Sequence, residues 1–173
     1  MKVNLIEHPT EKDWLEVKRR ALVTIGLNKI KTPPDFEWQQ KILRARHSPI
    51  RYLRFSFYIE CPYWVSVHLC RHVHAQPYVK TQRNDRQSEY DRNDAPQDSE
   101  VCMIYDVNAE ELMTIANKRL CFQASDETRE LVQAMCNEVL KVCSEFEGLL
   151  VRACEYNGRC QEMYPCQRYL WED

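Results

Sequence analysis

Residues 52–75 read YLRFSFYIECPYWVSVHLCRHVHA and contain the clearest local pattern in the chain. Over residues 52–60 apolar and polar side chains alternate, which predicts a β-strand with one buried face. Pro62 fits just before or within the first turn of a helix, where its fixed φ is tolerated. The segment therefore predicts a strand followed by a helix that ends near His72. The apolar face carries Leu53, Phe55, Phe57 and Ile59, and the polar face carries Arg54, Ser56, Tyr58 and Glu60.

Upstream of this segment, a strand and two helices are expected. Residues 1–7 alternate between apolar and polar side chains, as in an edge or outer strand. A helix is expected from Thr10, which suits an N-terminal cap, to about Gly26. Residues 35–47 predict a second helix that ends before Pro49, because a residue that precedes proline disfavours the helical conformation.

Downstream of the segment, a strand and two further helices are expected. Residues 101–107 alternate and predict a second strand. Asn108, with Glu111 three residues later, forms a capping-box pattern that begins a helix. Ser125 begins the last helix, whose apolar side chains keep helical spacing up to Leu150, over roughly 25 residues. Because this exceeds the average helix length, we expect a central or interface helix.

Together these elements predict an α/β (α+β) fold. Helices alternate with a few widely spaced strands, so we expect a small mixed sheet flanked by helices, with a long C-terminal helix. The length of 173 residues suits a single domain that comprises residues 1–173. Residues 76–100 are polar with nearly balanced charges, and they predict a long functional or mobile loop.

The composition excludes several classes of function. A formal net charge of -2 leaves no basic surplus, so no nucleic-acid partner is expected. The longest apolar runs are far shorter than the roughly 18 residues of a membrane span, and the charged N-terminus does not match a signal peptide. We therefore expect a cytoplasmic protein with no membrane partner. The three glycines are isolated and cannot form the glycine-rich loops of dinucleotide-binding or P-loop folds.

The nine cysteines are expected to be mostly buried thiols. Their number is odd and none follows a Cys-x-x-Cys pattern, so neither a disulfide framework nor a zinc ribbon is indicated. Cys136 and Cys143 lie one heptad apart on the apolar stripe of the last helix, where a small apolar side chain fits better than a metal ligand. The C-terminal cysteines recur every six residues, a spacing that the sequence does not explain.

Polar side chains suited to ligand binding concentrate after the first strong strand. His68, Arg71 and His72 share one helical face, and Thr81 and Arg83 follow on the polar loop. Guanidinium groups donate paired hydrogen bonds to phosphate and stack on flat rings, and a hydroxyl adds another donor. This pattern indicates a site for an anionic nucleotide, and the alternative is a solvated helix end.

The same segment resembles the signature of the flavin-dependent thymidylate synthases, also called thymidylate synthase complementing proteins. That signature is Arg-His-Arg, a gap of seven residues and then Ser-x-Arg, and Arg71, His72, Thr81 and Arg83 have this spacing. Two further blocks are similar and occur in the same order, which is harder to obtain by chance than one block. The upstream block contains Ser48, Pro49, Phe55, Phe57, Pro62 and Trp64, and the downstream block contains Asn108, Leu112, Asn117, Arg119, Ala124, Glu127 and Arg129.

The resemblance implies a short, divergent member of that family with the family's fold and cofactor. It implies FAD bound near Arg71 and His72 and by Asn117 and Arg119. In such a flavoprotein the reduced flavin supplies the hydride, and the protein supplies orientation and electrostatics. NADPH is the implied reductant of the flavin.

The resemblance also implies the reaction and the assembly. The reaction is the reductive methylation of deoxyuridylate (dUMP) to dTMP, with methylenetetrahydrofolate as co-substrate and one-carbon donor. The implied contacts with dUMP come from Thr81, Arg83 and Arg129, and Arg129 is the implied catalytic residue because it could stabilise charge that develops on the ring. A homotetramer is implied as well, since the family builds each site from several subunits.

The chain departs from the family signature at several positions. Val73 replaces the second Arg, Val79 replaces a Glu or Gln, and Cys102 stands where a strand Arg contacts the substrate phosphate. The stretch between Arg83 and Val101 is also shorter than usual. These differences keep open a second hypothesis, in which the fold binds a nucleotide or flavin but modifies another pyrimidine or is inactive.

Two weaker hypotheses concern the same residues. His68 and His72 lie one helical turn apart, which suits a metal site. Cys70 and His74 are nearby, but Cys70 would leave the histidine face of a helix. A nucleic-acid or protein-binding module that uses the arginines of residues 71–92 is disfavoured, because acidic side chains interrupt the cluster.

Overall fold

The alternating segment forms a central strand of the sheet. The computed structural model describes residues 1–27, 29–86 and 91–166. Strand β2 (Arg54–Pro62) pairs antiparallel with β1 (Lys2–Glu7), which is an edge strand as expected. The buried apolar side chains of β2 lie on the predicted face, with Phe57 and Ile59 fully excluded from water.

Two more strands complete the described part of the sheet. Strand β4 (Glu100–Asn108) pairs with the other side of β2, and β3 (Gln76–Val79) pairs with β4, which gives the order β1-β2-β4-β3. All the described pairs are antiparallel, so the prediction of a mixed sheet is wrong. The clean alternation of β2 and β4, with one buried face, is itself typical of antiparallel sheets.

The prediction of a loop over residues 76–100 is wrong for its first residues, because Gln76–Val79 form strand β3. This strand is short and contains Pro77, which is tolerated at a sheet edge and weakens the strand pattern in the sequence. After β3 the described residues form a 3₁₀ turn, η2 (Asn84–Arg86), and the chain returns through β4. Residues 87–90 of the predicted loop, and residues 167–173 of the predicted domain, lie outside the described residues.

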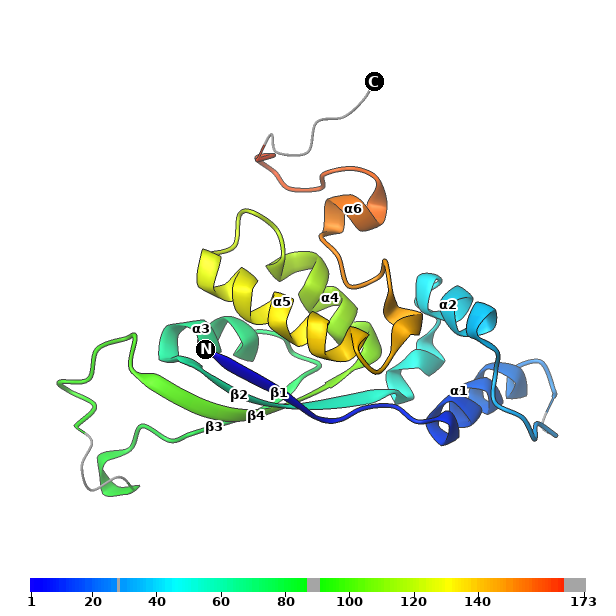
Figure 1. Cartoon of the computed structure of the whole chain (residues 1–173), viewed down its shortest axis with the longest axis horizontal. Helices are drawn as coiled ribbons and strands as arrows, with labels where there is room; N and C mark the ends of the chain where they lie inside the picture. The colour runs from blue at the N-terminus through cyan, green and yellow to red at the C-terminus, as the bar shows by residue number, and fades with distance from the viewer. Residues whose placement is uncertain (28, 87–90, 167–173) are drawn as a thin grey trace.

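The helices form a layer on one side of the sheet and a cluster at one of its ends. Helices α3, α4 and α5 lie over one sheet face, and α1 and α2 lie beyond one end of the sheet (Figure 1). None of the described helices is long and apolar enough to cross a membrane. The helical elements are α1 (Glu11–Val23), α2 (Phe36–Arg44), η1 (Ser48–Tyr52), α3 (Tyr63–Cys70), α4 (Ala109–Arg119), α5 (Asp126–Leu140), η3 (Ser144–Phe146) and α6 (Ala153–Asn157).

Polar caps fix where the two helices of the layer begin. The Asn108 side chain accepts a hydrogen bond from the backbone N–H of Glu111 at 3.0 Å, as the capping pattern predicts. Ser125 accepts from the backbone N–H of Thr128 in the same way. The Glu111 side chain does not complete a capping box, because its carboxylate faces His72 instead.

The last long helix is shorter than predicted. Helix α5 ends at Leu140, and the chain then turns through η3 and through Gly148, whose φ of 72° is left-handed. Phe146 is still fully buried and meets Phe55 edge to face at 5.4 Å, so apolar side chains after the helix keep the predicted burial without helical backbone. The α5 stripe is covered within the chain, which removes the reason to expect an interface helix. Its buried members are Leu131, Val132, Met135, Cys136 and Val139.

The cysteines are less buried than predicted. All nine lie in described residues as free thiols, but only Cys61, Cys136 and Cys143 are buried. Burial raises the pKa of Cys136 and of Cys143 to about 12, so both remain protonated core thiols, as expected. Four others surround one small hollow between the α4–α5 connection and the C-terminal segment: Cys121, Cys154, Cys160 and Cys166.

The one-sided layer architecture predicts different costs for the same substitution on the two sheet faces. Ile59 is fully buried, whereas Ile104 points to the face that the described helices leave open. We expect Ile59→Val to lower the free energy of unfolding by about 1 kcal/mol and Ile104→Val to lower it by less than about half as much. Urea denaturation at equilibrium measures both values. Equal losses would contradict the one-sided core.

Candidate functional site

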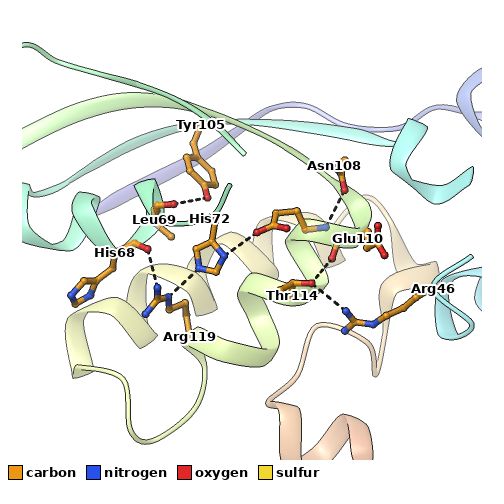
Figure 2. A network of polar contacts seen from close by, with 10 residues as sticks. Arg46, His68, Leu69, His72, Tyr105, Asn108, Glu110, Thr114 and Arg119 are labelled. Carbon is orange, nitrogen blue, oxygen red and sulfur yellow. Dashed lines mark hydrogen bonds and ion pairs between the residues drawn. The ribbon is translucent and has the colours of Figure 1, made fainter. Parts of the chain in front are cut away.

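His72 lies between two charged side chains of α4. Its Nδ1 is 3.0 Å from Glu111 Oε1, and its Nε2 is 3.1 Å from Arg119 Nε. Figure 2 shows the His72 ring pointing at α4 and meeting Arg119 there. The side chains of His72 and Glu111 are only 10% and 8% exposed to water. This three-residue contact is therefore shielded from solvent on most sides.

The partners of His72 fix its protonation state. Arginine nitrogens only donate hydrogen bonds, so His72 Nε2 must be the acceptor and Nδ1 must carry the proton that Glu111 accepts. Burial lowers the pKa of His72, and the Arg119 charge acts in the same direction, against the opposing effect of the hydrogen bond to Glu111. His72 is consequently a neutral imidazole near pH 7.

The end of α3 is held by side chains from other elements. Arg119 Nη2 donates to the carbonyl of His68 at 3.1 Å, and the Tyr105 hydroxyl of β4 donates to the carbonyl of Leu69 at 3.1 Å (Figure 2). His68 Nδ1 lies 2.9 Å from the Thr128 hydroxyl of α5. The last carbonyls of a helix lack partners within the helix, so these contacts satisfy them and fix the position of the segment that carries His72.

A cationic hollow adjoins this network. His72, Lys118, Arg119 and Gln123 line it together with Glu162, whose carboxylate is 3.7 Å from Lys118 Nζ. Burial lowers the pKa of Arg119, and the charge of Arg71 lowers it further. Burial, Arg119 and Arg71 likewise lower the pKa of His68. Such a concentration of positive charge favours an anionic ligand.

Asn117, on helix α4, connects this helix to other segments of the chain. Its Oδ1 accepts from Arg46 Nη2, and its Nδ2 donates to the carbonyl of Val151 at 2.7 Å. Arg46 also donates to the Thr114 hydroxyl at 3.2 Å (Figure 2) and lies 4.8 Å from the ring centroid of Tyr156. Both ends of the Asn117 amide are thus used within the chain, where they join α4 to the segments before η1 and after η3.

Thr81 and Arg83 lie on the exposed segment that follows β3. The Arg83 guanidinium donates to both oxygens of Asp85, at 2.9 and 2.6 Å. The backbone N–H of Arg83 donates to the Thr81 hydroxyl at 3.3 Å. Exposed ion pairs contribute about 1 kcal/mol or less, so an anionic ligand could take the place of Asp85 at low cost.

Arg129 lies on α5 and makes local contacts. Its Nη1 donates to the carbonyl of Ala124 at 2.9 Å, and its Nη2 donates to Asp126 at 2.5 Å. The guanidinium is 5.5 Å from the ring centroid of Phe122, which is within range of a cation–π contact. Arg129 and Phe122 line a hollow that also includes Arg152.

The structure therefore brings together only part of the residue set predicted from the sequence. His72, Arg119 and Asn117 belong to the packed region around α4, with Arg71 exposed at its edge. Arg83 and Arg129 line two other hollows. Sequence reasoning missed Lys118 and the contact between Glu111 and His72. The spacing of Glu111 from Asn108 was fully explained by capping, so no signal pointed to His72.

The metal hypothesis finds no support in the geometry. Among the described residues, no group of three or more His, Cys, Asp or Glu side chains is placed to hold a metal ion. His68 and His72 face different partners, since one meets Thr128 and the other meets Glu111 and Arg119. Cys70 is exposed.

The lowered pKa values of His68 and His72 predict a loss of stability in mild acid. In the unfolded chain both titrate near the ordinary value of about 6.5, above their folded pKa, so the unfolded state binds protons first. We expect the free energy of unfolding, from urea denaturation, to fall as the pH drops below about 6.5. His72→Gln should make this dependence shallower, and an unchanged slope would contradict the neutral, buried imidazole.

Comparisons with known proteins agree with this fold and these motifs. Residues 78–144 match the family model described as thymidylate synthase complementing protein. No curated protein matches the chain in sequence.

The solved structure of thymidylate synthase X from Helicobacter pylori, with FAD and dUMP, is similar to this chain in fold. It has a TM-score of 0.67 and 16% identity, and the match covers 87% of this chain and 99% of that chain. The UMP/dUMP methylase PolB from Streptomyces cacaoi, bound with 5-Br dUMP, has a TM-score of 0.67 and 15% identity over 87% of this chain and 96% of that one. The family resemblance found in the sequence is thus confirmed over residues 78–144, and the chain shares the fold of these solved structures.

Proposed function

We propose that this protein is a flavin-dependent thymidylate synthase-like enzyme that methylates a uracil nucleotide, converting dUMP to dTMP. The observation that carries the proposal is the family match over residues 78–144, which includes Thr81, Arg83, Asn117, Arg119 and Arg129. The shared fold supports it, because nearly the whole length of the Helicobacter pylori synthase is matched. In the same proposal, residues 1–173 form one cytoplasmic domain.

FAD is the proposed cofactor, and the residues around α4 suit part of that role. Arg119, Lys118 and His72 line the cationic hollow, and Arg71 is exposed beside it, so two or three cations could meet the cofactor's phosphates. Asn117 suits the role less directly, because its amide is already bonded to Arg46 and Val151. We assign Asn117 to the support of α4, and the direct contacts to the other four residues.

The bound flavin, once reduced, would supply a hydride to the substrate. We propose NADPH as its reductant and methylenetetrahydrofolate as the one-carbon donor, as the family resemblance implies. The residues of this chain then contribute binding and orientation. Neutral His72 accepts a hydrogen bond from Arg119 through Nε2, which orients the guanidinium next to the hollow without adding a second charge to the contact.

Thr81, Arg83 and Arg129 are the proposed contacts with the nucleotide. Arg83 has the planar fork that matches a phosphate, and its present partner Asp85 is an exposed carboxylate that phosphate could replace. Arg129 is only partly exposed and lies beside an aromatic ring, where a guanidinium interacts more strongly with charge that develops on a ligand than it would in water.

Assembly from several copies is part of the proposal. Arg83 and Arg129 line different hollows of one chain, so a site that uses both is more simply built from two chains. The sheet face that the described helices leave open carries Tyr58, Ile104 and Tyr78 in one row, and Tyr78 is 61% exposed. We propose a homotetramer in which a second copy covers this face.

The second candidate function is the modification of another pyrimidine nucleotide. PolB, a UMP/dUMP methylase, matches this fold as well as the synthase does, with the same TM-score. A 2′-hydroxyl distinguishes UMP from dUMP, so a comparison of these two substrates separates the candidates.

The activity is tested by the release of tritium from C5-labelled dUMP, with C5-labelled UMP in parallel, in the presence of FAD, NADPH and methylenetetrahydrofolate. We expect release from dUMP, and a loss of about tenfold to a hundredfold in Arg83→Ala and in Arg129→Ala, because each removes a charge-assisted contact. Arg19→Ala, which removes an exposed arginine of α1, is the control and should keep full activity.

The other possible results of the tritium-release assay distinguish between the hypotheses. Release from UMP alone would favour the second candidate function. If the FAD-loaded protein releases tritium from neither nucleotide, the proposed reaction is wrong. Release that survives both arginine substitutions would refute the residue assignments while it leaves the reaction in place.

The assembly is tested by light scattering on the purified protein. We expect the mass of four chains, and a lower mass for Tyr78→Glu, because a carboxylate on the open sheet face is costly to bury. Val142→Glu, at an exposed apolar residue beyond α5, should leave the mass unchanged. A monomer mass for the wild type would contradict both the tetramer and the shared site.

A further inference from the structure

We propose that Glu111 is a positioning residue of the cofactor site, which holds His72 in the tautomer that lets it orient Arg119. This inference rests on the proposed function, since it assigns to Arg119 a contact with an anionic group of the cofactor. Neither the sequence pattern nor the comparisons assign Glu111 any role beyond a helix cap. The contacts around His72 carry the argument.

The tautomer follows from the hydrogen-bond inventory of the three side chains. Arg119 Nε can only donate, so the lone pair of His72 must be on Nε2. The proton of the neutral ring is then on Nδ1, where Glu111 Oε1 lies at 3.0 Å. Without an acceptor at that position, the ring could place its proton on Nε2 instead, and two donors would then face each other across 3.1 Å.

The burial of Glu111 also indicates that its carboxylate is paired with His72. The residue is 7% exposed, and a buried carboxylate is costly unless it is paired and hydrogen-bonded. Its backbone N–H is already capped by Asn108, so its carboxylate is not needed at the helix start. The carboxylate is therefore committed to His72, and the negative charge of Glu111 balances the positive charge of Arg119 across the neutral ring.

The orientation of Arg119 depends on this arrangement. Its Nε is held by His72 and its Nη2 by the carbonyl of His68, and two bonds fix the plane of a guanidinium group. The same side chain lines the hollow with Lys118 and Gln123. A fixed donor beside a second cation suits a phosphate group, because less conformational freedom is lost when the ligand binds.

Protonation of His72 would undo the arrangement. A second proton on the ring converts Nε2 into a donor and places a positive charge next to Arg119. The charged or titratable groups around the ring are Glu111, Lys118 and Arg119 from α4, His68 and Cys70 from α3, Arg71 at its end, Tyr105 from β4, and Glu162 from the C-terminal segment. Glu111 is the buried carboxylate among them, so its negative charge offsets the nearby cations with little screening by water.

The tautomer is measured directly by ¹⁵N NMR of the histidine rings in the ligand-free protein near pH 7. We expect the His72 ring to show a protonated Nδ1 and an unprotonated Nε2 in the wild type. Glu111→Gln should keep this state, because the amide oxygen can still accept from Nδ1. Glu111→Ala should shift the ring towards the other tautomer. A protonated Nε2 in the wild type would overturn the proposal.

The consequence for the ligand is measured by titration of each variant with FAD. We expect Glu111→Ala to weaken FAD binding by about tenfold and Glu111→Gln by less than about threefold, as for residues that orient a ligand-binding side chain. Glu110→Ala is the matched control, since it removes a carboxylate one residue away that faces Arg51 instead of His72, and its affinity should be unchanged.

The outcomes separate this inference from the proposed function. If the wild type binds FAD and both Glu111 variants bind it equally well, the positioning role is wrong and the proposed function stands. If the wild type does not bind FAD, the proposed function is wrong whatever the tautomer. If Glu111→Ala does not fold, the wild-type tautomer and the affinity of Glu111→Gln still decide. A protonated Nε2 in the wild type, or a loss of about tenfold or more in the affinity of Glu111→Gln for FAD, would refute the proposal.

Discussion

The two hydrogen bonds of Arg119, to the His72 ring and to the His68 carbonyl, join the end of α3 to the end of α4. The residues that the family resemblance assigns to the cofactor therefore depend on one half-buried guanidinium. The constraint is electrostatic as well as geometric. A cation in this position requires a neutral imidazole and a nearby carboxylate, and Glu111 supplies the carboxylate.

The sheet explains why this contact is possible at all. Strands β2 and β4 are central neighbours, and each leads directly into a helix of the same layer: β2 into α3 and β4 into α4. Both helices consequently lie over the same sheet face (Figure 1), where the end of α3 meets the end of α4. Tyr105 strengthens this connection, because its buried hydroxyl bonds from β4 to the end of α3.

Much of this fold can be predicted from local sequence patterns, and the failures have physical causes. The β2 and β4 patterns are clear because one face of each is buried, and Asn108 and Ser125 mark helix starts because their side chains cap backbone N–H groups. Strand β3 was missed because an edge strand with Pro77 has little apolar pattern. The end of α5 was missed because Phe146 stays buried after the helix stops, so the apolar spacing continues while the backbone turns.

The site was predictable only in its residue types. Spacing and resemblance identified His72 and Arg119, but the role of Glu111 depends on the meeting of two helices, which no local pattern encodes. The binding of FAD in the cationic hollow at α4 is tested by the absorbance spectrum of the purified protein, before and after titration with FAD. We expect a yellow protein, or one whose flavin spectrum shifts until about one equivalent per chain is bound. A colourless protein that leaves the spectrum and fluorescence of added FAD unchanged would contradict it.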